Sequence, residues 1–134
     1  MFKPYERINS AKEIMKNCSD CEATSRNVIH QSYYAIFNQL VHEVDNRLFY
    51  LVDEDVKRKS VHKAYIDGCT NKLFDFQKNS SNYGSLSNFV NITRRLRGLR
   101  RRADYEIGSE VRRAEAELSI LQAEQAILAL ESLD

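Results

Sequence analysis

Apolar residues recur every three or four positions along most of the chain, the spacing that places them on one face of an α-helix. A first helix is predicted by the apolar positions Ile8, Ala11, Ile14, Met15 and Cys18. The sequence Ser19-Asp20-Cys21-Glu22 has the form of a capping box and predicts the start of a long second helix. That helix carries two adjacent apolar rows, so we expect it to face two neighbours. The rows are Ile29, Tyr33, Ile36, Phe37, Leu40, Val44 and Leu48, and His30, Tyr34, Phe37 and Val41.

The second half of the chain shows the same periodicity with three interruptions. Residues 53–55 form an acidic break, 78–85 are the clearest loop, and 105–109 form a bend. We expect Ser85 or Ser87 to cap the fourth helix and Ser109 to cap the last one. The apolar positions of the three predicted helices are Val61, Tyr65, Cys69, Leu73 and Phe76; Phe89, Ile92, Leu96, Leu99 and Ala103; and Val111, Ala114, Leu118, Leu121 and Leu128.

The composition supports an all-α protein. There is one proline, there are four glycines, and no run alternates apolar and polar residues as a strand would. At 134 residues, with no repeat or low-complexity tract, the chain is expected to form one domain, 1–134. Short connections between long amphipathic helices predict an up-and-down bundle of four or five helices.

The balance of charge is nearly neutral overall but uneven along the chain. The formal net charge is +1. Residues 94–102 contain six arginines, whereas residues 103–134 contain eight acidic and two basic side chains. The arginines are therefore either a solvated face that pairs with an acidic helix or a local nucleic-acid-binding surface. Both interpretations stay open at this point.

Localisation and redox chemistry follow from what the sequence lacks. The N-terminus has no apolar segment of secretory length, and the longest uniformly apolar stretch, 126–130, is too short to cross a membrane. Three cysteines suit a reducing compartment, so we expect a cytoplasmic protein with no membrane association. The pair Cys18-x-x-Cys21 lacks a second ligand pair at zinc-finger spacing, and we expect no metal and no cofactor.

A helical projection of the predicted fourth helix divides its arginines into two kinds. Arg94, Arg97 and Arg101 fall opposite the apolar stripe and are expected at the surface. Arg100 borders the stripe, four residues before Asp104, so the two side chains can hold each other. A positioned guanidinium beside the Tyr105 hydroxyl could then bind a phosphodiester.

Two short motifs resemble the HEPN superfamily, the higher eukaryotes and prokaryotes nucleotide-binding domains. The first lies in SRNVIHQSYYAIFNQL, on Tyr33, Tyr34, Ala35 and Phe37. The second lies in LRGLRRRADYE, on Leu99, Arg100, Ala103, Asp104 and Tyr105. The resemblance spans roughly residues 5 to 130, and within the superfamily the chain is most similar to its small prokaryotic members.

The resemblance implies a helical bundle that forms a homodimer, with the polar motif in a cleft at the dimer interface. Many members are metal-independent endoribonucleases that act as toxins in toxin–antitoxin systems or in anti-phage defence. In those enzymes an arginine steadies the scissile phosphate, and a histidine that follows it after four to six intervening residues transfers a proton. This chain has Tyr105 at that place, and a phenol with an ordinary pKa near ~10 is a poor base at neutral pH.

These observations define the candidate residues. Arg100, Asp104 and Tyr105 are the catalytic candidates, and Arg97, Arg101, Tyr34 and His30 are the RNA-binding candidates. His30 is the histidine best placed to act with them, while His62 has no partner that the sequence reveals. The first functional hypothesis is an RNA-binding or RNA-cleaving protein with an antitoxin partner. The alternative is a non-catalytic interaction module that binds a nucleotide or a partner protein such as a nucleotidyltransferase.

Overall fold

The computed structural model describes residues 5–17, 22–48, 52–106 and 108–133, and most of these residues are helical, with no strand among them. The described residues form six α-helices. Two of the helices continue into a tighter or wider turn: α2 into the π-helical turn Val44–Leu48 and α4 into the 3₁₀ turn Leu73–Asp75. The helices are α1 (Tyr5–Asn17), α2 (Glu22–Glu43), α3 (Glu54–Lys59), α4 (Val61–Lys72), α5 (Ser81–Tyr105) and α6 (Arg113–Glu131).

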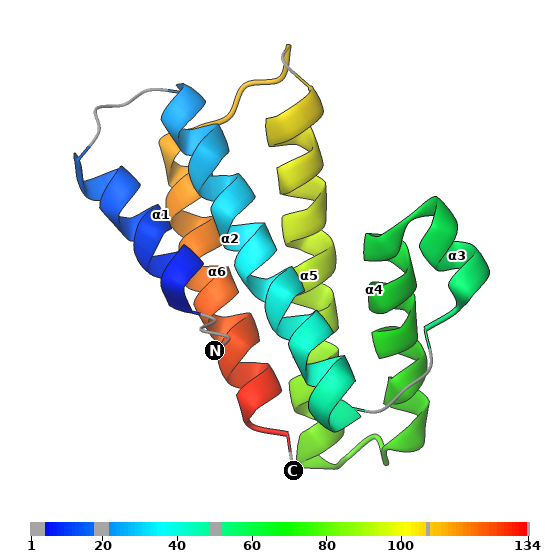
Figure 1. Ribbon diagram of the computed structural model, residues 1–134. Coiled ribbons are helices and arrows are strands. Elements are labelled where there is room, and N and C mark those ends of the chain that lie inside the picture. Colours follow the sequence, from blue (N-terminus) through cyan, green and yellow to red (C-terminus); the bar gives the residue numbers. More distant parts are fainter. Residues whose placement is uncertain (1–4, 18–21, 49–51, 107, 134) are drawn as a thin grey trace.

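Four of the helices form an up-and-down bundle. Helices α1, α2, α5 and α6 lie side by side with alternating directions, and α2 packs against α1, α5 and α6 (Figure 1). Helices α3 and α4 form a hairpin that stands beside α5, with α4 in contact with α5 (Figure 1). The prediction of an all-α bundle is confirmed.

The sixth helix arises where an acidic break was expected. Asp53 caps α3, because its carboxylate accepts the backbone N–H groups of Asp55 and Val56. The acidic residues of this stretch then occupy the positive end of the α3 dipole, where negative charge is favourable. Short-range capping therefore extends helical structure into a segment that has no apolar stripe of its own.

Several predicted helix ends are wrong by a few residues. Helix α5 begins at Ser81 and is capped by Ser80, whose hydroxyl accepts the Tyr83 N–H, so neither Ser85 nor Ser87 is its cap. Helix α6 begins after Arg112 and not after Ser109, because the Glu115 carboxylate accepts the Arg112 N–H at 3.2 Å. Helix α4 ends at Lys72, before the predicted position Phe76.

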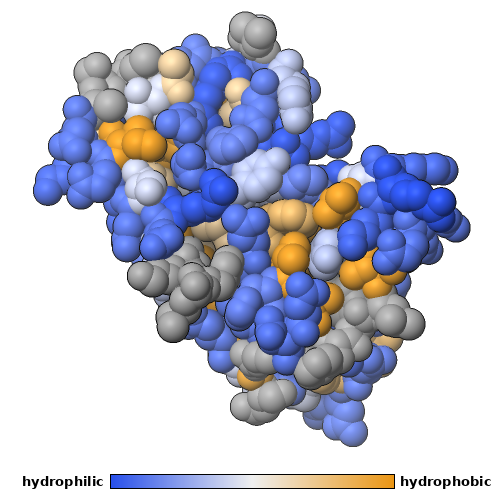
Figure 2. Space-filling view, in the orientation of Figure 1, coloured by the Kyte–Doolittle hydropathy of each residue, from blue (hydrophilic) through white to orange (hydrophobic). Residues whose placement is uncertain are grey.

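The core lies around α2. Its side chains Ile29, Tyr33, Ile36 and Leu40 are fully buried between the flanking helices. Hydrophobic residues also reach the surface in the middle of the face that Figure 2 shows, between the lower part of α2 and α4. Against α6, the Ser119 hydroxyl donates to the buried Ser32 hydroxyl at 3.2 Å. A hydrogen bond between two serines requires the helices to approach closely, as small side chains permit.

Helix α6 presents a different face to the core from the one its leucines predict. Leu118, Leu121 and Leu128 are exposed, with 47, 59 and 57 % of their surface accessible. The side chains that pack inside are Ala116, Ser119, Ile120, Ala123, Ile127 and Leu130. The helix is apolar on most of its circumference, so periodicity alone fits two faces, and close packing with α2 selects the face with the small residues.

Two observations concern predictions made from local motifs. Cys18, Cys21 and the predicted capping residue Ser19 lie outside the described residues. Within the described ranges, none of the helices combines the length and the apolar character that a membrane crossing would require.

The orientation of α6 can be tested with two adjacent residues. Ile127 is fully buried, whereas Leu128 is 57 % exposed. We expect Ile127→Ala to lower the free energy of unfolding by about 2–5 kcal/mol, because it leaves a cavity in the core. Leu128→Ala should change it by less than about 0.5 kcal/mol. Urea unfolding followed by circular dichroism measures both, and a larger loss in Leu128→Ala would show that the leucine face is the packed one.

Candidate functional site

Arg100 lies inside the protein, against three tyrosine rings. The residue is only 5 % exposed. Its guanidinium carbon is 5.2 Å from the centre of the Tyr33 ring, 5.6 Å from that of Tyr34 and 5.5 Å from that of Tyr105. Each distance is within the range of a cation–π interaction, which is strengthened by removal from water. The expectation that Arg100 differs from the surface arginines is confirmed.

Arg100 donates two hydrogen bonds to side chains of its own helix. Its Nη1 donates to the Tyr105 hydroxyl at 3.2 Å and, at 3.5 Å, to Oδ2 of Asp104. Its Nε is buried and has no hydrogen-bond partner among the described residues. Burial acts to lower the pKa of Arg100, but the oxygen atoms of Tyr34, Tyr105 and Tyr33 outweigh it and the pKa is raised. The group is therefore a permanent, partly unsatisfied cation.

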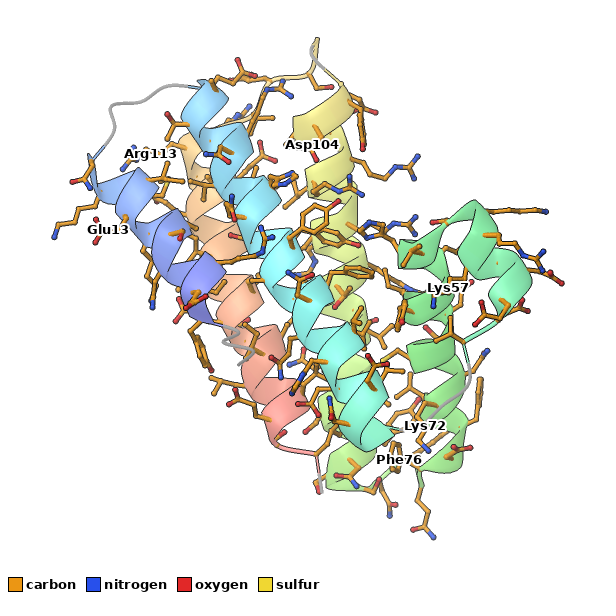
Figure 3. The ribbon with its side chains drawn as sticks, viewed as in Figure 1. Glu13, Lys57, Lys72, Phe76, Asp104 and Arg113 are labelled. Carbon is orange, nitrogen blue, oxygen red and sulfur yellow. The ribbon has the colours of Figure 1, made fainter. Side chains whose placement is uncertain are left out.

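Asp104 joins Arg100 to a histidine on another helix. Its Oδ2, the same oxygen that faces Arg100, lies 2.9 Å from Nδ1 of His30 on α2. Figure 3 labels Asp104 near the upper end of α5, close to α2. The His30 ring also lies against the Tyr34 ring, with 4.6 Å between centres. We call His30, Tyr34, Arg100, Asp104 and Tyr105 the candidate site.

The members of the candidate site differ in their exposure to solvent. The side chain of His30 is 38 % accessible and that of Asp104 is 20 % accessible. Tyr105 is 70 % exposed, whereas Tyr34 is half-buried. A ligand can therefore approach the His30 imidazole and the Tyr105 phenol. Arg100 lies beneath them and contacts Tyr105 and Asp104 from the interior.

Arg26, which the sequence did not single out, holds the end of α5 against α2. Its Nη1 donates to the carbonyl oxygens of Arg102 at 3.0 Å and Ala103 at 2.8 Å. Its Nη2 donates to the carbonyl of Glu106 at 3.2 Å and to that of Ser109. The last carbonyls of a helix have no partner within the helix, and one guanidinium here satisfies several of them. We call this set of bonds the Arg26 clamp.

Glu22 completes the clamp from the first turn of α2. Its carboxylate accepts from Arg26 Nη2 at 3.0 Å and from the backbone N–H of Val111 at 3.1 Å. These two hydrogen bonds hold the pKa of Glu22 below its ordinary value. The connection between α5 and α6 is thus fastened to α2 on both sides of the bend.

His62 has partners in the structure, contrary to the expectation from the sequence. Together with Tyr33 and Phe37 it forms the wall of side chains beneath Arg100. Its Nδ1 lies 2.7 Å from the Tyr33 hydroxyl, and its ring stacks on Phe37 with 4.2 Å between centres. Burial, together with the positive charges of Arg100 and Arg97, lowers the pKa of His62 to about 4. Burial raises the pKa of Tyr33 to about 12. Both groups are neutral at neutral pH, so Arg100 faces no second charge from this wall.

The surface arginines of α5 line a groove beside α4. A cavity of about 330 Å³ is bordered by the residues that we call the basic groove: Lys63, Ile66, Asp67, Arg94, Arg97, Gly98 and Arg101. Arg94 and Arg101 are exposed, as expected. Arg97 is half-buried instead, and its Nη2 reaches the Ser60 hydroxyl at 3.4 Å. The side chain is drawn inward because the α3–α4 hairpin packs beside α5, which the helical projection could not include.

The sequence left open that the arginine run pairs with the acidic last helix, and the structure shows such a pairing for Arg102. This side chain forms an ion pair with Glu115 of α6. Arg95 is exposed, and Arg94 donates to the Thr70 hydroxyl of α4 at 2.9 Å. The run is therefore divided among three directions: toward α6, toward the candidate site and toward the basic groove.

The chemistry available at the site is that of a buried cation, a carboxylate–imidazole pair and a solvent-facing phenol. Within the described parts of the chain, no group of three or more His, Cys, Asp or Glu side chains is placed to hold a metal ion. No protein-family model, curated protein or solved structure matches this chain. The resemblance to the HEPN superfamily thus rests on the two sequence motifs.

The Arg26 clamp predicts a specific loss of stability. Arg26→Lys keeps the positive charge, but one ammonium group cannot serve the four carbonyls. We expect it to lower the free energy of unfolding by about 1–3 kcal/mol, because the carbonyls of this helix end, most of them in partly buried hydrogen bonds, lose their donor. Hydrogen exchange should also accelerate at the Glu106 amide, which bonds to the Arg102 carbonyl at 3.1 Å.

Arg95→Lys is the matched control. Arg95 is an exposed arginine of α5, and it takes no part in the Arg26 clamp. It should change stability by less than about 0.5 kcal/mol. Equal stability and equal exchange in Arg26→Lys and the control would contradict the role assigned to the clamp.

Proposed function

We propose that the protein binds RNA, with phosphates in the basic groove and one nucleotide at the candidate site. The observation that carries this proposal is that the basic groove and the candidate site are adjacent on α5. Arg97 borders the groove, and Arg100, one turn later, belongs to the site. The proposal is that of a HEPN-type protein, as the two motifs suggest.

The charges of the groove favour a polyanion. Arg94, Arg97, Arg101 and Lys63 border it, and the carboxylate of Asp67 is 3.0 Å from Lys63 Nζ. Arg94 and Arg101 are seven residues apart, about 10 Å along the helix axis, so they can contact successive phosphates of one strand. With a net charge of only +1, the attraction is local to this groove.

The aromatic rings favour a single-stranded nucleic acid. Tyr105 is 70 % exposed and Tyr34 borders His30, so an unpaired base can stack on one of these rings while its phosphate faces Arg100. Single-stranded RNA combines such bases with a regular row of phosphates. In line with the resemblance, we propose that the protein cleaves RNA without a metal ion, acts as a homodimer in a toxin–antitoxin or anti-phage system, and works in the cytoplasm.

The non-catalytic interaction module is the second candidate, and the burial of Arg100 favours it. A side chain that is 6 % accessible and packed among three rings can serve to fix the end of α5 without touching a ligand. In that case the surface beside α5 binds a nucleotide or a partner protein such as a nucleotidyltransferase.

Salt-dependent RNA binding tests the proposal. Fluorescence anisotropy with a labelled, mixed-sequence single-stranded RNA oligonucleotide should show binding that weakens steeply as salt increases, because phosphate contacts release counterions. Arg101→Gln should weaken binding and reduce the slope of log Kd against log salt by about 1. Arg95→Gln, on another face of the same helix, should leave both the affinity and the slope unchanged.

The interaction-module candidate predicts different behaviour. It predicts no binding of this RNA at low salt, or binding that Arg101→Gln and Arg95→Gln weaken equally through nonspecific charge. Either result would reject the groove as an RNA-binding surface.

A further inference from the structure

We infer that His30 is the proton-transfer residue of this site and that Asp104 positions it. The inference rests on the proposed RNA binding and deepens it. Tyr105, at the end of the arginine motif, is a poor base, and the inference assigns the role of base to His30. It stands on a contact between α2 and α5 that joins residues 74 positions apart.

The pairing with Asp104 determines which nitrogen of His30 can react. An ionised carboxylate can only accept hydrogen bonds, so Nδ1 must carry the hydrogen in the 2.9 Å contact. The neutral ring then has its lone pair on Nε2. The carboxylate also stabilises the imidazolium that forms when Nε2 takes a proton, as in other carboxylate–histidine pairs. His30 is 38 % accessible, so a substrate can reach the ring.

The same carboxylate oxygen places the base beside the phosphate-binding group. Asp104 Oδ2 contacts both His30 Nδ1 and Arg100 Nη1, so the imidazole and the guanidinium lie within two hydrogen-bond lengths of each other. A phosphodiester that faces Arg100 therefore lies within reach of the His30 ring. Proximity of this kind is the first requirement for a general base.

The other histidines do not meet this requirement. His62 is committed to the Tyr33 hydroxyl and to the Phe37 ring, and its pKa is lowered to about 4. His42 lies twelve residues after His30, about 18 Å further along α2, where its carbonyl accepts from Asn46 at 2.7 Å. Of the three histidines, His30 is the one whose ring contacts the carboxylate that also contacts Arg100.

The reaction is an internal transesterification of RNA, in which the nucleophile is the 2′-hydroxyl of the RNA and not a water molecule. Nε2 of His30 takes the proton of the 2′-hydroxyl, and the 2′-oxygen attacks the neighbouring phosphorus. The new 2′-O–P bond forms as the P–O5′ bond breaks, and the 5′-oxygen takes a proton from the Tyr105 hydroxyl, whose own oxygen accepts from Arg100 at 3.2 Å. Solvent returns the proton to Tyr105 and removes the one on His30. The products carry a 2′,3′-cyclic phosphate and a 5′-hydroxyl.

Cleavage of a fluorogenic single-stranded RNA, measured beside RNA affinity, tests the inference. We expect His30→Gly to reduce kcat by about 10²–10⁴-fold and to raise the Kd for RNA by a much smaller factor, since arginines make most of the phosphate contacts. Added imidazole should restore part of the activity of His30→Gly. Asp104→Asn should lower kcat more than it changes KM, and Asp104→Glu should recover part of the loss. His42→Asn is the control and should cleave like the wild type.

The outcomes separate this inference from the proposed function. If the wild type binds RNA with the expected salt dependence but does not cleave it, or if His30→Gly cleaves at the wild-type rate, the inference is overturned and the binding function stands. If imidazole does not restore activity in a folded His30→Gly protein, His30 is structural and the inference also fails. If the wild type does not bind RNA, both proposals fail together.

Discussion

The interaction on which the site depends is the contact of one guanidinium with the end of α5. Arg26 on α2 donates to the carbonyls of Ala103 and Glu106 at the end of the helix, and also to that of Arg102, which accepts the Glu106 N–H as well. Arg26 lies one turn before His30, and the carbonyls that it binds belong to the turn that carries Asp104. The clamp therefore sets the distance between α2 and α5 at the place where the carboxylate and the imidazole meet.

Beside the clamp, the protein holds a buried cation, Arg100, whose charge is balanced by its neighbours. Arg100 is balanced by the faces of three tyrosine rings and by its ion pair with Asp104, whose Oδ2 also contacts His30. The wall on its other side stays neutral, because burial lowers the pKa of His62 and raises that of Tyr33.

The sequence predicts five of the six helices of the described residues and the division of the arginines except for Arg97, because both depend on the 3.6-residue period. Arg100 differs from Arg94 and Arg101 as a projection of α5 alone indicates. The packed face of α6 could not be predicted, because Leu128 and Ile127 are both apolar and only the approach of α2 distinguishes them. The contacts of Asp104 with His30 and of Tyr33 with His62 join residues distant in sequence, and no local pattern encodes them. The one available signal was that Arg26 and His30 lie on one face of α2, four residues apart.

The tautomer of His30 is the most direct test of this account, because it depends on the clamp, on the end of α5 and on the carboxylate together. Nitrogen-15 NMR of the histidine side chains reports which ring nitrogen carries the hydrogen in the neutral form. The account predicts hydrogen on Nδ1 of His30 in the wild type and loss of this preference in Asp104→Asn. Hydrogen on Nε2 in the wild type, the form that free histidine prefers, would contradict the account.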